Sequence, residues 1–122
     1  MVLTIGLDEK TSIQLEQMAR VRSVEAVTLA RDAIRTFLRD ESRRIIDQEA
    51  KAYRRLHPEL LRSMPGQFVA VHNGQVVDHD SDQMAVFRRV EEAFGGQPVL
   101  IRQVRPEIDQ TIEIMSPRLE YA

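Results

Sequence analysis

The chain opens on a short segment with the period-two pattern of a β-strand and no obvious neighbour to pair with. Apolar side chains occupy every second position, at Leu3, Ile5 and Leu7, as in a half-buried strand. A single strand of about six residues is not stable alone, because its backbone groups need a partner strand. No second strand-like segment follows for about sixty residues. The segment must therefore pair either with distant C-terminal strands or with its own copy in a dimer.

Helical patterns fill the region after this segment. Asp8 is expected to cap a helix that runs to about Arg20, and Ser23 is expected to cap a second one after a very short connection. Apolar residues then recur at helical spacing as far as Leu56, but the pattern weakens near residue 42. The sequence leaves open whether this is one long helix or two. Pro58 is disfavoured inside a helix and should end the pattern, with a new helical turn after it.

The order strand, helix, short turn, capped helix resembles the ribbon-helix-helix DNA-binding proteins, the Arc, MetJ and CopG class. The residues that carry the resemblance are Leu3-Thr-Ile-Gly-Leu-Asp-Glu, Leu15-Glu-Gln-Met-Ala and Arg22-Ser-Val-Glu-Ala. In that class two chains pair their first strands into an antiparallel ribbon that enters the major groove. Four helices from the two chains form one shared core. The resemblance thus implies an obligate homodimer that binds DNA.

The resemblance also assigns roles to individual positions. The base-facing residues would be Val2, Thr4 and Gly6. The phosphate contacts would come from Arg22, Ser23 and Val24 at the start of the second helix, where free backbone N–H groups attract anions. The shared dimer core would contain Leu3, Ile5, Leu7, Leu15, Met18, Val27, Ile34 and Phe37.

The C-terminal part predicts a small β-β-α-β module, with a fourth strand at 111–115. Asn73-Gly74 lies between two strand-like runs and is typical of a tight hairpin turn. A helix follows from Asp80, ends at Gly95-Gly96 and precedes a strand at 99–104. The run from Gly66 to Ile101 resembles a small prokaryotic domain of unassigned function. That resemblance implies a fold but no activity. If the protein is a DNA-binding regulator, the module would bind a cognate protein partner or set higher assembly.

Catalytic and metal chemistry find little support in the sequence. There is no Cys, and only three His are present, so thiol nucleophiles and Cys-ligated metals are excluded. With a two-residue turn, His72 pairs with Gln75 and His79 with Phe68, which puts both imidazoles on one face but about 13 Å apart. They cannot share one zinc ion. Asp80 or Ser81 is expected to cap the following helix, and the other acids, Asp78 and Asp82, to lie at its positive end.

The net charge of −2 comes from 17 basic and 19 acidic residues. Residues 1–45 hold eight basic and seven acidic side chains, so this half is the one that could face DNA. No apolar run is long enough to span a membrane, and no signal peptide is recognisable. The expectation is a cytoplasmic bacterial protein that is not an enzyme, has no membrane partner, and uses no cofactor and no metal.

We therefore expect an α+β protein with three parts: a dimeric ribbon-helix-helix unit at 1–42, a helical connector at 43–63, and the β-β-α-β module at 64–122. The predicted function is a homodimeric, sequence-specific DNA-binding transcriptional regulator, such as an antitoxin or an autorepressor. The alternative is a dimeric adaptor that does not bind DNA. In that case the N-terminal unit only dimerises, and the C-terminal module binds a partner protein.

Overall fold

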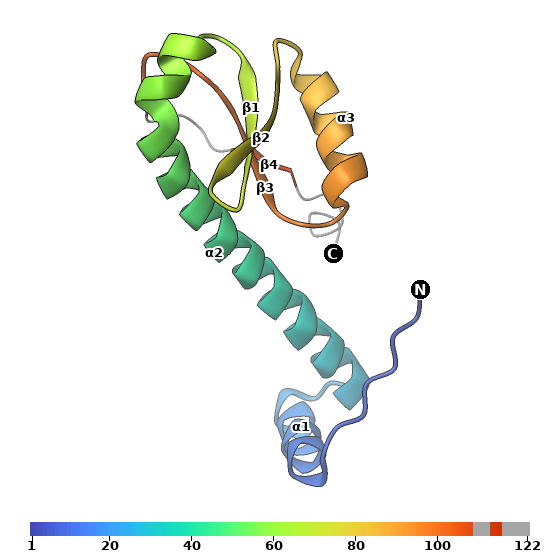
Figure 1. Cartoon of the computed structure of the whole chain (residues 1–122). Coiled ribbons are helices and arrows are strands. Elements are labelled where there is room, and N and C mark those ends of the chain that lie inside the picture. The colour runs from blue at the N-terminus through green and yellow to red at the C-terminus, as the bar shows by residue number, and fades with distance from the viewer. Residues whose placement is uncertain (109–112, 116–122) are drawn as a thin grey trace. The chain divides into compact units, whose positions relative to one another are not determined.

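The computed structural model describes residues 1–108 and 113–115. Its elements, in chain order, are α1 (Glu9–Arg22), α2 (Ala26–Ser63), β1 (Phe68–His72), β2 (Gln75–Asp80), α3 (Gln83–Phe94), β3 (Val99–Gln103) and β4 (Glu113–Met115) (Figure 1). The chain divides into two compact units, residues 1–38 and residues 39–122. We call them the N-terminal unit and the C-terminal unit. Helix α2 contributes its first turns to one and the rest to the other.

The predicted N-terminal ribbon is wrong for this chain. Residues 1–8 form no strand, and helices occupy most of residues 9–63 before the first strand begins at Phe68 (Figure 1). The physical reason lies in backbone pairing, because a strand persists only where its N–H and C=O groups meet a neighbouring strand. Within the described residues, the sheet is built from β1 to β4 alone. The alternating pattern of residues 2–7 is thus not sufficient to make a strand.

Helix α1 begins as the sequence predicts. The Asp8 carboxylate accepts a hydrogen bond from the Thr11 N–H at 3.3 Å, which satisfies a donor that the helix leaves free. Ser23, however, does not cap the second helix. It closes α1 from the left-handed region, at φ 57° and ψ 43°, and α2 begins only at Ala26. Ser23 therefore belongs to the end of α1 and not to the start of α2.

Helix α2 is one continuous helix of 38 residues, without a break near residue 42. It also runs through Pro58, which was expected to interrupt it. Proline removes one backbone hydrogen bond and usually costs about 3 kcal/mol inside a helix. Tyr53, His57 and Leu60 are buried on both sides of this position. Their packing holds the helical geometry that the local sequence disfavours.

The strands form an antiparallel sheet in the order β2-β1-β3-β4, between α2 on one face and α3 on the other (Figure 1). The alternating side chains of β1 divide between two cores. Val69 and Val71 pack with Tyr53 and Leu60 of α2, whereas Ala70 packs with Val86 and Val90 of α3. The C-terminal unit is thus a three-layer structure with the sheet buried on both sides. The predicted strand at 111–115 appears as β4 at 113–115; residues 111 and 112 lie outside the described part.

The Asn73-Gly74 hairpin turn is confirmed, with both residues at positive φ (52° and 75°). The predicted register of the hairpin is only partly right. His72 pairs with Gln75, but an irregularity after Ala70 shifts the pairing, so that Val69 rather than Phe68 faces His79. Paired residues of an antiparallel ladder point to the same face. His72 and His79 therefore lie on opposite faces of the sheet, not on the same one.

Candidate functional site

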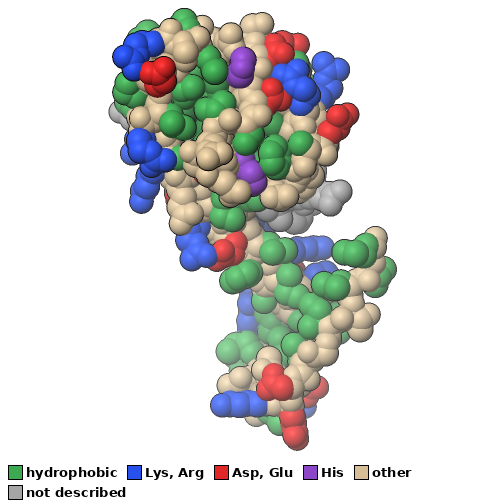
Figure 2. Space-filling model, in the orientation of Figure 1, with side chains coloured by type: hydrophobic (Ala, Val, Ile, Leu, Met, Phe, Trp, Pro, Cys, Tyr) green, Lys and Arg blue, Asp and Glu red, His purple; other side chains and the backbone are tan. Residues whose placement is uncertain are grey.

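The N-terminal unit has almost no core of its own. Ala19 is the single buried residue among residues 1–38, all of which the structure describes. Figure 2 shows hydrophobic side chains gathered on the surface of this unit. The large exposed ones are Met1, Val2, Leu3, Ile5, Leu7, Ile13, Met18, Val21, Val24, Val27, Ile34, Phe37 and Leu38. We call this set the apolar surface of the N-terminal unit.

Exposed hydrophobic side chains are concentrated in that unit. Across the described residues, only Val77 and Met84 are large, hydrophobic and exposed outside it. Contiguous apolar surface of this kind on a soluble protein usually marks an interaction site. The contrast is informative because the C-terminal unit buries its own apolar residues in two clusters, one on each face of the sheet. The apolar surface is therefore a property of one unit and not of the whole chain.

All eight predicted dimer-core residues lie in this unit, and none of them is buried within the single chain. Leu15 is partly buried, and the others are exposed: Leu3, Ile5, Leu7, Met18, Val27, Ile34 and Phe37. On α2, Val27, Ile34 and Phe37 are separated by seven and three residues, so they lie along one stripe of the helix. Val2, Thr4 and Gly6, predicted to face bases, are also exposed.

The residues predicted to hold a phosphate are placed differently from the expectation. The Ser23 N–H donates to Arg20 O at 3.2 Å, and the Val24 N–H donates to Ala19 O at 3.0 Å. These amides complete the end of α1 and already have acceptors. The polar side chains that this segment still presents to solvent are those of Arg22 and Ser23. The free amides of α2 come later, before Leu29, whose N–H donates to Glu25 O.

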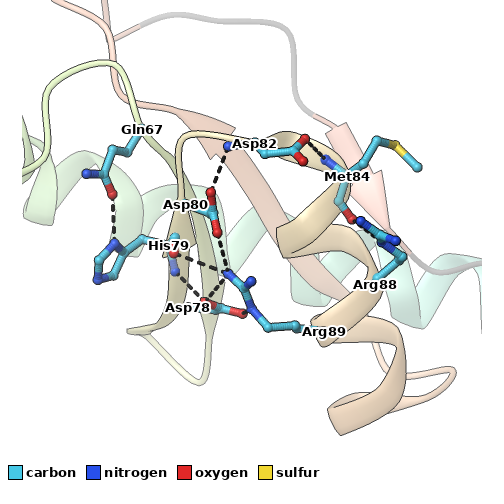
Figure 3. Close-up of polar contacts among 8 residues, drawn as sticks. All are labelled: Gln67, Asp78, His79, Asp80, Asp82, Met84, Arg88 and Arg89. Atoms are coloured by element: carbon cyan, nitrogen blue, oxygen red, sulfur yellow. Dashed lines mark hydrogen bonds and ion pairs between the residues drawn. The ribbon is translucent and has the colours of Figure 1, made fainter.

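Two of the three acids of β2 and the β2–α3 turn form an ion-pair cluster with Arg89 (Figure 3). Arg89 of α3 donates to both oxygens of Asp78, at 2.7 and 3.0 Å, and to Asp80 at 3.2 Å. The Arg89 guanidinium holds the pKa of the Asp78 carboxyl below its usual range. Asp82 caps α3 by accepting from the Met84 N–H, a role that the sequence had assigned to Asp80 or Ser81. The Asp78 and Asp80 carboxylates both form ion pairs with Arg89 that link β2 to α3. This structural role argues against a role for either carboxylate in acid–base catalysis.

Within residues 1–108 and 113–115, no group of three or more His, Asp or Glu side chains is arranged to hold a metal ion. His79 Nδ1 is hydrogen-bonded to Gln67 Oε1 at 2.7 Å (Figure 3), and His57 Nε2 to Arg105 O at 2.6 Å. Both imidazoles thus have structural partners. In the same part of the chain, no helix is long and apolar enough to cross a membrane.

A hollow in the C-terminal unit brings together residues that the sequence did not single out. It lies between α2, the Asn73-Gly74 turn and Gln97-Pro98, and it has a volume of about 450 Å³. Glu49, Arg55 and His72 contribute to its lining. Glu49 and Arg55 belong to a helix of mixed charge, which is typical of a solvated face. Glu49 differs from the other charged residues of this helix face because its side chain is buried, with an exposed fraction of 5%. No local sequence pattern predicts that burial.

Residues 59–107 match a family of unknown function, DUF5678. The matched segment includes the end of α2, the hairpin, α3 and β3. It covers the same region as the small β-β-α-β module and assigns no activity to it. Curated proteins and solved structures give no match.

Proposed function

We propose that this protein is a homodimeric DNA-binding regulator of the bacterial cytoplasm, whose N-terminal unit both dimerises and contacts DNA. The observation that carries the proposal is the apolar surface of a 38-residue unit with one buried residue. A segment of this size cannot bury enough apolar area to fold by itself. It needs a partner, and a second copy of the chain carries the same apolar face.

A dimer would place two copies of each polar group about a two-fold axis, as a palindromic DNA site requires. The resemblance of residues 2–40 to DNA-binding proteins supports nucleic acid as the ligand. The Arg22 side chain and the Ser23 hydroxyl are the groups we assign to phosphate, and Thr4 is the hydrogen-bonding side chain we assign to a base edge. In such a regulator, an antitoxin or autorepressor role would fit a chain that also carries a module for a protein partner.

Two observations favour a second candidate, a dimeric adaptor that does not bind DNA. Residues 1–38 contain five basic and five acidic side chains, so the N-terminal unit has no net positive charge. In addition, the Ser23 and Val24 amides are already hydrogen-bonded. In this candidate the N-terminal unit only joins two chains, and the C-terminal unit binds the partner protein.

A DNA titration separates the two candidates. The full-length protein would be titrated onto its own upstream DNA and onto a scrambled sequence, at low and near-physiological salt. The regulator predicts tight binding to the first DNA and weaker, more salt-sensitive binding to the second. Equally weak binding to both that disappears as salt rises would reject the regulator and leave the adaptor.

Three variants refine this assay. We expect Thr4→Ala to weaken specific binding by about tenfold, as the loss of one base contact does, while Thr36→Ala, on an exposed part of α2, leaves it unchanged. Arg22→Gln should weaken binding to both DNA sequences and reduce its salt dependence. If Thr4→Ala and Thr36→Ala bind DNA equally well, residue 4 makes no contact with a base.

A further inference from the structure

The hollow in the C-terminal unit contains opposite charges that are not paired with each other. Its lining residues are Ile45, Gln48, Glu49, Ala52, Arg55, His72, Asn73, Gly74, Gln97 and Pro98. They come from α2, from the end of β1 and the β1–β2 turn, and from the segment before β3, all inside one compact unit. A volume of about 450 Å³ is within the range of small-ligand sites.

Glu49 has one satisfied oxygen and one that lacks a partner. Its Oε1 accepts a hydrogen bond from the Gly74 N–H at 2.9 Å, which fixes the carboxylate under the hairpin turn. Its Oε2 is buried and has no hydrogen-bond partner among the described residues. Buried carboxylate oxygens are normally hydrogen-bonded, because their hydration is lost. Glu49 Oε2 is therefore an acceptor that lacks a hydrogen-bond donor.

Arg55 brings a positive charge to the same turn. Its Nη2 lies 3.8 Å from the point where a Cβ atom on Gly74 would be, so Arg55 and Glu49 both converge on that glycine. Within the described part of the chain, Arg55 forms no ion pair, with Glu49 or with any other carboxylate. The guanidinium is exposed and can pair with an anion from solution.

His72 adds a third group. Its Nδ1 is buried without a hydrogen-bond partner in the described structure, while its ring packs against Phe94 with the centroids 4.5 Å apart. With the proton on Nε2, Nδ1 is an acceptor. In this tautomer, Glu49 and His72 present two acceptors that lack donors, next to one cation that lacks an anion.

We propose that this hollow binds a free α-amino acid. The ligand's ammonium group, which has three donors, would bind Glu49 Oε2 and His72 Nδ1, and its carboxylate would pair with Arg55. A ligand with only one of the two charges would leave either the acceptors or the guanidinium unmatched. Glu49 Oε2 and His72 Nδ1 are both buried, so the ligand would reach them only after a side chain at the rim of the hollow, such as the exposed Arg55, changes its conformation. The proposal does not depend on DNA binding.

The test is a titration of the ¹⁵N-labelled full-length protein with each common L-amino acid, at concentrations up to the millimolar range. We expect at least one of them to cause saturable shifts of the Asn73 and Gly74 amides and of the Gln97 side-chain amide. The amine and the carboxylic acid that each retain one charge of that ligand should bind at least about tenfold more weakly. Absence of a saturable shift at these amides with every amino acid would overturn the proposal, as would equal binding of a one-charge analogue.

Variants check the assigned contacts. Arg55→Gln and Glu49→Gln should each weaken binding by about tenfold or more, while Arg54→Gln, the neighbouring exposed arginine outside the hollow, should leave the affinity unchanged. Because Arg55 is exposed, its variant is expected to fold normally, and it therefore tests the site even if Glu49→Gln is unstable. Equal affinities of Arg55→Gln and Arg54→Gln would contradict the assignment of the carboxylate to Arg55.

Discussion

Asn73 and Gly74 adopt a conformation that most residues avoid. Both have positive φ, at 52° and 75°, and the Gly74 N–H also donates to the buried carboxylate of Glu49. Glycine adopts this region without the steric cost that a Cβ atom imposes. One residue thus shapes the hairpin and positions a charged group of the hollow.

Replacement of Gly74 by alanine should lower the free energy of unfolding by about 1 kcal/mol, the usual cost of a Cβ atom in the left-handed region. The added Cβ would meet its nearest atoms at 3.8 and 4.0 Å, which is ordinary contact, so backbone strain is the expected cause. Urea unfolding at fixed protein concentration measures the change. Gly6→Ala is the matched control, because nothing lies within 4 Å of its Cβ position. Equal stabilities of the two variants would contradict this explanation.

Asp78 and Arg89 link β2 to α3 through charge. Hydrogen bonds and attraction from Arg89 lower the pKa of Asp78 in the folded chain. A carboxyl with a lowered folded pKa stabilises the fold above its unfolded pKa. That contribution is lost as the pH falls through the folded pKa, because the unfolded chain binds the proton first.

Arg89→Gln should therefore destabilise the protein at neutral pH and have less effect below about pH 4, the unperturbed range of an aspartate. The experiment measures urea unfolding of both proteins from pH 7 to pH 2.5. Arg88→Gln is the control, because Arg88 contacts only the Met84 carbonyl oxygen among the hydrogen bonds described for it. A destabilisation by Arg89→Gln that is the same at every pH would show that the ion pair does not contribute in this way.

At the scale of the element, α2 changes its environment along its length. Its first three turns carry Val27, Ile34 and Phe37 on the surface, whereas Ile46, Tyr53 and other residues of its later turns are buried. The Tyr53 side chain is fully buried; its hydroxyl donates to Gln103 O at 3.4 Å, and the Arg102 guanidinium lies 5.3 Å from its ring centre. The later turns are therefore one layer of the C-terminal unit rather than a spacer between two modules.

Tyr53→Ala should lower the free energy of unfolding by about 3–5 kcal/mol, the usual cost of removing a large buried aromatic side chain. Arg54→Ala, at the next position of the same helix but exposed, should change it by about 0.5 kcal/mol or less. Chemical denaturation, monitored by circular dichroism, gives the free energy of unfolding of both variants. Similar losses in the two variants would mean that α2 does not pack against the sheet at this point.

At the scale of the whole molecule, the apolar surface of the N-terminal unit is the feature that calls for a second chain. Phe37 is 62% exposed and continues the apolar stripe of α2. We expect a charge at this position to be incompatible with a buried interface, because an unpaired buried carboxylate loses its hydration. The C-terminal unit has its own core and should not depend on the partner in the same way.

Phe37→Glu should convert the homodimer to a monomer in sedimentation equilibrium, while Val77→Glu leaves the dimer intact. Val77 is also large, hydrophobic and exposed, but it belongs to β2 of the C-terminal unit. The wild-type protein must be dimeric under the same conditions. A monomeric wild-type protein, or a Phe37→Glu variant that remains dimeric, would contradict the proposed interface.

Local rules of backbone geometry let the sequence by itself determine several features. Asp8 caps α1, the Asn73-Gly74 pair makes the hairpin turn, and Gly95 ends α3, as the residue types predict. In each case a few adjacent residues contain the whole physical cause: a short acceptor side chain, or a glycine that tolerates positive φ. Such features can be predicted from a few adjacent residues of the sequence.

Tertiary structure decided everything that depends on residues far apart in the chain. Helix α2 passes through Pro58 because buried neighbours pack against the sheet, and His79 changes face because of an irregularity in the ladder. Residues 1–8 alternate like a strand yet form none, since a strand requires a partner and not only a pattern. The meeting of Glu49 and Arg55 at Gly74 likewise follows from the docking of a helix onto a hairpin about twenty residues away in sequence, and contacts at that separation leave no local signature.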